Sequence, residues 1–162
     1  MKYKLTDISF DKLEYSPKEL NTGTLINLKY DNEILEFQTP KILIHEIIKE
    51  GGKEYFLLKI IGNEACKKFI QKILELEQSF NKHFGVTVKS IFEGDHFIVK
   101  IPFIFSKPNM NVYSSDNSLF NYYHLSKGME IICLLQCNKL WMNKDSSFYY
   151  HLQVKEIMLL KK

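Results

Sequence analysis

The sequence predicts an α+β protein with a mostly antiparallel sheet and one amphipathic helix. Extended apolar stretches occur on both sides of a single helical segment at about residues 64–84. Turn-forming pairs such as Asp31-Asn32 and Gly51-Gly52 separate these stretches. The segment from Met129 to Leu160 has the composition of a long β-hairpin. Several strands, one helix and several more strands are the layout of an α+β chain.

The size and composition predict one packed domain. The chain has 162 residues, of which 45% are hydrophobic and 14% aromatic, enough for a sizeable core. We expect a single domain over residues 1–162, with residues 1–20 as an N-terminal arm. Ser16-Pro17 breaks any helix in that arm, so it is either an edge strand or a loose segment.

Strands and turns alternate in the first part of the chain. Asp31-Asn32 tolerates the positive φ of a tight turn, so the two stretches around it predict a hairpin. Pro40 cannot donate a ladder hydrogen bond and interrupts the pattern, which resumes after it. The predicted strands are residues 24–30, 33–38, 42–48 and 55–61.

The helix is predicted from Glu64 to Phe84, with Asn63 as its N-cap and Gly85 as its stop. Its apolar residues recur at three- and four-residue steps, so one face is apolar and the opposite face carries lysines. Such a helix should lie on a sheet.

After the helix, residues 86–92 and 97–105 bracket Glu93-Gly94-Asp95 and predict a second hairpin. Phe103 and Phe105 continue the alternate-residue face of Phe97, so both are predicted in the core. Residues 106–127 form a long polar loop, and a loop of that length in a compact domain is usually functional or disordered.

The C-terminal hairpin is predicted to join strands 129–141 and 148–160 through a turn at 141–148. Successive side chains of a strand point to opposite faces, which predicts two sets on the second strand. Phe148, Tyr150, Leu152, Val154, Met158 and Leu160 form one set, and Tyr149, His151, Gln153 and Lys155 form the other, polar-aromatic set.

Two sheet arrangements fit this order of elements. A helix between the third and fourth main strands of a closed sheet is the arrangement of the oligonucleotide-binding (OB) barrel, and this OB-fold-like barrel is our prediction. An open sheet with one covering helix is the competing architecture.

The charge pattern excludes a wholesale polycation but permits a local basic groove. The formal net charge is only +3, and all 22 basic residues are lysines. Without guanidinium groups, bidentate recognition of guanine is not possible for this chain. Contacts with anions are therefore predicted to be point-charge contacts that tolerate sequence variation.

Catalysis is not predicted. The five histidines are dispersed, and the sequence has no H-E-x-x-H, G-x-S-x-G or phosphate-binding glycine motif. Cys133 and Cys137 share one side of a strand, and His124 and His151 lie on neighbouring segments, but small buried cysteines are commonly core residues. We therefore predict no metal and no cofactor.

The cellular setting is predicted to be intracellular and without membrane association. Three cysteines without a C-x-x-C pair argue against a secreted disulfide scaffold. No apolar run approaches the roughly 20 residues of a membrane span.

The C-terminal turn predicts a binding surface for single-stranded nucleic acid. Lys139 and Trp141 share a face near the turn, where Lys144 also lies. Rings stack on bases and lysines pair with phosphates. The alternative is that Trp141 caps the core and the lysines are only solvated. The predicted contact residues are Lys41, Lys107, Tyr122, Tyr123, Lys139, Trp141, Lys144, Tyr149 and Lys155.

Several short motifs follow one another along the chain: Gln38-Thr39-Pro40-Lys41, the helix with Phe69 and Leu76, Phe105-Ser106-Lys107, and Leu140-Trp141 followed by a turn and Phe148. In this order they resemble the single-stranded DNA-binding proteins of large cytoplasmic DNA viruses. That family commonly has a glycine and then a tryptophan after the phenylalanine, where this chain has Tyr149 and Leu152. The lack of arginine suits an AT-rich viral or plasmid-like genome.

The resemblance implies an OB fold and a non-enzymatic, sequence-tolerant binder of single-stranded DNA in replication, recombination or repair. Self-association and a location in the host cytoplasm are further implications, while preference between DNA and RNA stays open. The alternative function is a small structural or interaction protein, such as a virion component. Its sign would be an exposed apolar patch without a basic stripe beside it.

Overall fold

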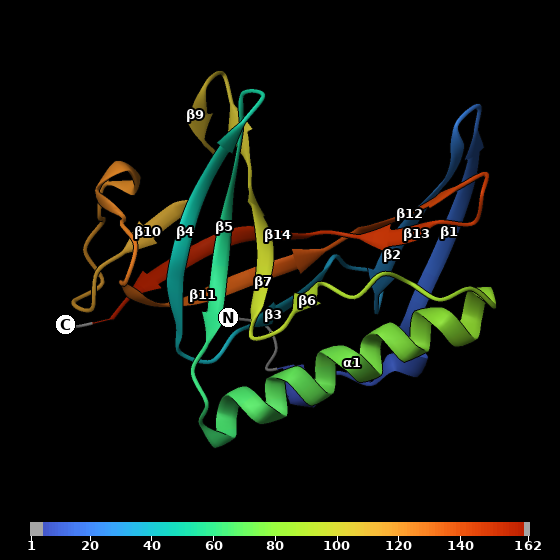
Figure 1. The fold of residues 1–162 in the computed structure, drawn as a ribbon, viewed down its shortest axis with the longest axis horizontal. Coiled ribbons are helices and arrows are strands. Elements are labelled where there is room, and N and C mark those ends of the chain that lie inside the picture. The colour runs from blue at the N-terminus through green and yellow to red at the C-terminus, as the bar shows by residue number, and fades with distance from the viewer. Residues whose placement is uncertain (1–4, 161–162) are drawn as a thin grey trace.

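The computed structural model describes residues 5–160, and Figure 1 shows two groups of strands above one long helix. Residues 1–4 of the predicted N-terminal arm, and residues 161–162, lie outside the described residues. The helix is α1 (Glu64–Phe84), and short 3-10 helices are η1 (Leu5–Asp7), η2 (Phe10–Lys12) and η3 (Tyr122–His124). The strands are β1 (Leu13–Leu20), β2 (Gly23–Tyr30), β3 (Leu35–Gln38), β4 (Ile42–Glu50), β5 (Lys53–Ile60), β6 (Phe92–Glu93), β7 (His96–Ile101), β8 (Phe103–Ile104), β9 (Lys107–Pro108), β10 (Asn111–Tyr113), β11 (Glu130–Cys137), β12 (Lys139–Asn143), β13 (Phe148–Tyr150) and β14 (Leu152–Leu159).

Five strands close into a barrel in the order β11-β4-β5-β7-β14. Neighbouring strands are antiparallel except β14 and β7, whose parallel pairing of Leu152 with Val99 and Gln153 with Lys100 closes the ring. The barrel confirms the predicted OB-fold-like α+β fold, and its closure rules out the open-sheet alternative. When the five barrel strands are numbered along the chain, β4, β5, β7, β11 and β14 become strands 1 to 5. Their order around the barrel is then 1-2-3-5-4, and strand 4 pairs with strand 1.

The helix has a different place among the barrel strands than predicted. It follows β5, the second barrel strand along the chain, and precedes β7, the third, whereas the prediction put it between the third and fourth main strands. The strands before residue 40 do not belong to the ring of the barrel. In the structure β1 and β2 belong to a separate four-stranded sheet, in the order β1-β2-β12-β13.

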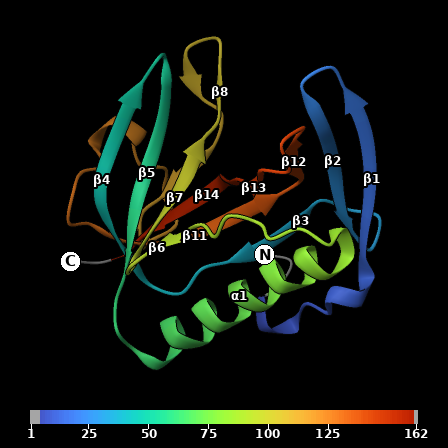
Figure 2. The same ribbon diagram turned by 45° about the vertical axis from the view of Figure 1, so that its right-hand side comes forward.

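The α1 helix begins and ends at the predicted residues. The side chain of Asn63 accepts a hydrogen bond from the Cys66 amide at 2.9 Å, and Gly85 ends the helix with a left-handed φ of 68°. The helix lies beneath both groups of strands in the two views of Figures 1 and 2, and its apolar residues contact each of them. The ring of Phe69 lies 5.8 Å from Phe97 of the barrel, and that of Phe80 lies 5.4 Å from Tyr150 of the four-stranded sheet.

The N-terminal arm contains a full strand, and the first predicted hairpin is wrong in its pairing. Asp31 and Asn32 do turn the chain, with φ of 53° and 65°. Beyond an isolated Tyr30–Glu33 bridge, however, β3 pairs with β11, while β2 pairs along its whole length with β1. The burial patterns explain the split, because β3 is buried on both faces and β2 on only one.

The predicted C-terminal hairpin is present, but each of its arms is broken. The first arm breaks at Asn138 and the second at His151, so the hairpin crosses from the barrel into the four-stranded sheet (Figure 1). The pairing of β11 with β14 shifts register at Leu134/Leu135, where β14 has one extra residue. Side chains of β14 beyond this point therefore face the opposite side from the one that strict alternation predicts. Ile157 is therefore buried in place of the predicted Met158.

The segment after the helix is less regular than predicted. Only Phe92–Glu93 and the start of β7 pair around Gly94, and residues 86–91 form no strand. Phe105 is 95% exposed, so its predicted place in the core is wrong. The alternating pattern ends because Phe105 and Ser106 take positive φ values of 51° and 64° and reverse the chain into the β8–β9 hairpin.

A buried carboxylate joins the helix to both neighbouring segments. Glu77 of α1 is 5% exposed and accepts hydrogen bonds from the Ser90 hydroxyl, the Ile91 amide and the Tyr150 hydroxyl. Burial, followed by the charge and hydrogen bond of Glu77, raises the pKa of Tyr150 well above its usual value. Glu77 thereby fixes the strand β13 and the segment before β6 to one helix. Among residues 5–160, no helix is both long and apolar enough to cross a membrane.

Replacing Glu77 with alanine should destabilise the protein by about 3 kcal/mol, because it leaves several buried donors without an acceptor. Urea denaturation measures the change. Glu75→Ala, an exposed glutamate on the same helix, is the matched control and should change the free energy of unfolding little. Equal effects of the two variants would contradict a structural role for the buried carboxylate.

Candidate nucleic-acid interface

The outer face of β5 and β7 carries rings, an apolar side chain and lysines. Along both strands one set of alternate residues, including Phe56 and Val99, fills the barrel interior. The other set points outward, and Ile98 at its centre is 42% exposed. The outward residues are Lys53, Tyr55, Leu57 and Lys59 on β5 and His96, Ile98 and Lys100 on β7.

Strand pairing places two of these side chains in one row with a side chain of β14. Tyr55 lies directly opposite Lys100, and Lys100 lies directly opposite Gln153 of β14. Directly opposite residues share a face of the sheet, so the three side chains are neighbours on the outside of the barrel. His151, just before β14, is exposed beside the row.

His151 is electrostatically linked to two lysines. Burial first, and then the positive charges of Lys100 and Lys53, lower the pKa of its imidazole. Lys53 and Lys100 therefore concentrate positive charge beside an imidazole whose neutral form is favoured, and we call these three side chains the basic cluster: Lys53, Lys100 and His151. A phosphate placed there would be attracted by the two lysines and would favour the protonated imidazole.

Four adjoining cavities form a groove across this face. The first, of about 600 Å³, lies between Tyr149, Ile98 and the segment 89–93. It shares Ile98 and His151 with a second cavity at the β4–β5 turn, which shares Lys53 with a third. The third shares Pro102 and Gln153 with a fourth, lined also by residues 108–111 and Lys155. We call these four cavities the groove.

The charge along the groove is uneven. Glu93 lines the first cavity, and Glu50, the partner of Lys53 in the β4–β5 pairing, lines the second, whereas the third is lined by Lys53 and Lys100 and by no acidic residue. His96 also lines the first cavity, with its Nδ1 2.8 Å from an Asp95 carboxylate oxygen and its ring 4.4 Å from that of His45. A polyanion would thus make its main charge contact near Lys53 and Lys100.

The four-stranded sheet continues the groove through Tyr149. Trp141 lies directly opposite Tyr149 on one side and Leu25 on the other, and Leu25 lies opposite Lys18. The opposite face, with Phe148 and Tyr150, packs on the helix. The row of Lys18, Leu25, Trp141 and Tyr149 therefore faces away from α1.

Gly23 makes room for the indole of Trp141. A Cβ at Gly23 would lie 3.0 Å from Cζ2 of that ring and 2.3 Å from the backbone oxygen of Met142. The indole N–H donates a hydrogen bond to the side chain of Asn143. The ring is thus held against Gly23 and Asn143 and is half-buried, with Lys139 on the same face.

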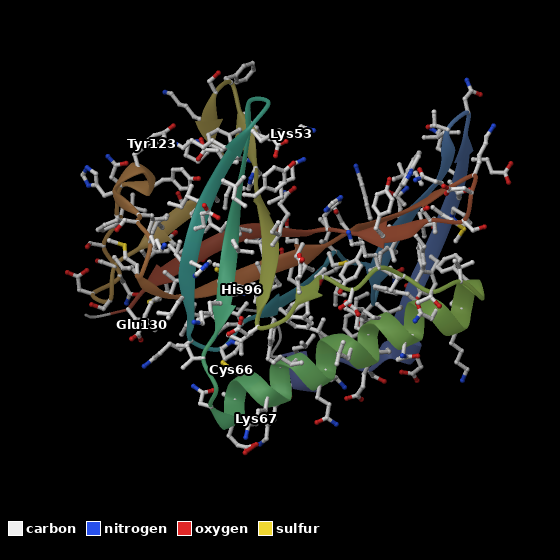
Figure 3. All side chains as sticks on the ribbon, in the orientation of Figure 1. Lys53, Cys66, Lys67, His96, Tyr123 and Glu130 are labelled. Atoms are coloured by element: carbon white, nitrogen blue, oxygen red, sulfur yellow. The ribbon has the colours of Figure 1, made fainter. Side chains whose placement is uncertain are left out.

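The structure brings together some of the predicted contact residues and separates others. Tyr149 and Lys155 line the groove, Lys139 and Trp141 lie on the adjoining sheet face, and Lys144 lies in its turn. Lys107 is on the β8–β9 hairpin. Lys41, just before β4, forms an ion pair with Glu130 at 3.6 Å. Tyr123 lies in η3 and is 59% exposed. Neither residue lines the groove. Figure 3 shows Tyr123 near the β10 loop.

Two predicted contacts have structural partners. Tyr122 is only 8% exposed, donates its hydroxyl proton to Glu54 at 2.8 Å and stacks on Phe56, so its ring is not available to bases. Burial, and then Glu54, raise the pKa of its hydroxyl. Lys155 forms an ion pair with Glu36 at 2.8 Å, which offsets part of its charge.

Sequence reasoning missed most of the groove. Tyr55, Ile98 and Lys100 were in predicted strands and Lys53 lay just before one, but periodicity cannot show that those two strands are neighbours. The available signal was the outward phase of each strand, where a ring or isoleucine alternates with lysine. His151 was placed correctly on a polar-aromatic face, although it was not among the predicted contacts.

The cysteines form no candidate metal site. Among the described residues, no group of three or more histidine, cysteine or acidic side chains is placed to hold a metal ion. Burial raises the pKa of Cys133, and raises that of Cys137 to about 12, so both remain neutral thiols in the core.

Known structures share the fold of this chain. The single-stranded DNA-binding protein of bacteriophage Enc34, C-terminally truncated, is 14% identical, with a TM-score of 0.57 over 94% of this chain and 96% of that one. Its structure in complex with single-stranded DNA gives 13% identity and a TM-score of 0.50 over 94% and 97%. Bacteriophage T7 gp2.5, a single-stranded DNA-binding protein, gives 12% and 0.53 over 79% and 87%.

The fold is shared with phage single-stranded DNA-binding proteins. At 12–14% identity the likeness is one of fold. No protein-family profile and no curated protein sequence matches the chain. The expected origin in a large cytoplasmic DNA virus stays a prediction, since these neighbours come from bacteriophages.

Removing the basic neighbours of His151 should raise its pKa toward the usual histidine value, because the charged imidazole would meet less repulsion. The change is Lys53→Ala with Lys100→Ala, and the measurement is an NMR titration of the His151 ring. Lys139→Ala, which removes a lysine on the other sheet, is the control. An unmoved titration in the double variant would show that the basic cluster does not exist in solution.

Proposed function

We propose that this chain is a non-enzymatic, sequence-tolerant single-stranded DNA-binding protein that acts in DNA replication, recombination or repair. The observation that supports it best is the groove on the outer face of a closed OB-fold-like barrel, with rings and lysines along it. The fold shared with phage single-stranded DNA-binding proteins adds to this support.

Three side chains along the groove offer surfaces on which bases can stack. Tyr55 and Tyr149 are half-buried, so each ring is held in place while part of it remains open to the groove. Ile98 lies between them as an exposed apolar contact. Each stacked base contributes about 1–3 kcal/mol by alanine substitution, so two or three would suffice for useful affinity.

The phosphates would lie near the basic cluster. Lysine contacts are point charges that do not fix the orientation of a phosphate, which suits a ligand of varied sequence. The strand would then run past Tyr149 toward Trp141, with Lys139 and Lys144 beside it. Because these contacts release counterions, binding should weaken steeply with salt.

An interaction protein is the second candidate function. Its sign, an exposed apolar patch without basic neighbours, is found only in part: Leu119 and Tyr123 are exposed on the loop around η3, and neither lines the groove. Since the groove joins rings to lysines, nucleic acid fits it better. Self-association, an intracellular location and binding of RNA beside DNA are further expectations of the proposal.

Binding should favour a single strand of about 30 nucleotides over its duplex and should depend on salt. Lys53→Ala should weaken binding severalfold and lower the salt slope by about 0.7. Lys67→Ala is the matched control, because Lys67 is an exposed lysine at the start of α1, remote from Lys53 in Figure 3. Fluorescence anisotropy at two salt concentrations measures both. The proposal fails if the unmodified protein does not bind at low salt.

Tyr149→Ala should weaken binding by about 1–3 kcal/mol through loss of one stacking ring. Tyr123→Ala removes an exposed tyrosine outside the groove and should leave the affinity unchanged. Circular dichroism of both variants checks that the fold is kept. Equal losses would point to a binding surface other than the groove.

A further inference from the structure

A phenylalanine occupies the tip of the β8–β9 hairpin, where folding gives no reason for it. Phe105 is 95% exposed and Ile104 beside it is 51% exposed. Phe105 and Ser106 form the turn with positive φ values, a conformation that favours glycine or asparagine and is unusual for a bulky residue. Neither core packing nor turn geometry therefore explains the ring.

The hairpin adjoins the groove. Figure 1 shows β9 and the turn between β4 and β5 rising at the same end of the barrel. The third cavity of the groove, of about 310 Å³, is lined by Gly52 and Lys53 from that turn and by Pro102 and Phe103 from the base of the hairpin. Lys100 of the basic cluster lines it as well. A strand that follows the groove would thus pass between the two hairpins.

The side chains near the tip are basic, and the apolar area of the tip itself is small. Residues 102–108 include Lys107 and no acidic residue, and Lys53 lies across the third cavity. A stable protein interface buries more than about 1,000 Å², which two apolar side chains cannot supply. One ring face, by contrast, is the unit of stacking on a base. The charge and the size of this tip both favour nucleic acid over a protein partner.

We propose that Phe105 is a base-stacking residue that extends the path of a single strand beyond the barrel. The β8–β9 hairpin and the β4–β5 turn form the two sides of this extension, with Lys53 and Lys107 near the phosphates. The proposal rests on the proposed function, because it assigns a further contact to the same ligand. It adds a site on a connection between barrel strands, outside the faces described above.

Phe105→Asn distinguishes a role in binding from a role in folding, because it should lower the affinity for DNA without lowering the stability of the fold. Asparagine tolerates the left-handed conformation, so the unfolding midpoint should stay equal or rise. Affinity for a 30-nucleotide strand should fall about 5- to 150-fold, the loss of one stacked base. Leu119→Asn, which removes a 72% exposed leucine that lines none of the four cavities, should leave that affinity unchanged.

A fluorescence measurement reports on the ring directly. The sequence has one tryptophan, so Trp141→Phe combined with Phe105→Trp leaves a single indole at the hairpin tip. Phenylalanine at position 141 keeps a ring on the adjoining sheet. Stacking of a base on the indole at position 105 should quench its emission when the 30-nucleotide strand is added, in step with the anisotropy.

Each outcome decides between the possible roles of the tip. Binding by the unmodified protein, with no loss in Phe105→Asn and no quenching, overturns this inference and leaves the proposed function intact. Loss of self-association in sedimentation velocity, with DNA affinity unchanged, overturns it in favour of contact with a second copy. Failure of the unmodified protein to bind the strand overturns both proposals.

Discussion

The parallel pairing between β7 and β14 is the constraint on which the rest of the structure depends. It consists of only two residue pairs, Leu152 with Val99 and Gln153 with Lys100. Those pairs close the barrel, and they also bring Lys100 beside Gln153 and place His151 next to Ile98. Without this closure the outward side chains of β5 and β7 would have no neighbour from the C-terminal part of the chain. Folding and the groove therefore depend on the same contact.

A second constraint keeps the two sheets together. The C-terminal hairpin crosses between them at Asn138 and His151, and α1 lies under both. Glu77 ties that helix to Tyr150 and to the segment before β6, both of which border the first cavity. The half-buried rings of Tyr149 and Trp141 are consequently held on a rigid support. A ring fixed before a ligand arrives loses less conformational entropy on binding than a mobile one.

Local chemistry predicted more of this fold than of its surface. Asn63 and Gly85 set the helix limits because capping depends on neighbouring residues alone. The pairing of β2 with β1, in place of β3, depends on which strands are buried on both faces, and a single sequence shows this only weakly. Phe105 followed the apolar alternation yet lies outside the core, because a turn reversed the chain first. Lys53 and Lys100 were missed for a similar reason: their proximity is a product of barrel closure.

The three cysteines have a practical consequence. Cys66, Cys133 and Cys137 are fully buried, and the thiol of Cys66 donates a hydrogen bond to the backbone oxygen of Lys41 at 3.5 Å. Thiol-reactive dyes attack exposed thiolates, which the folded chain does not present. A cysteine introduced on the surface can accordingly be labelled selectively without removing the native ones. Distances between the two hairpins flanking the third cavity thus become accessible to energy-transfer measurements in an otherwise unaltered protein.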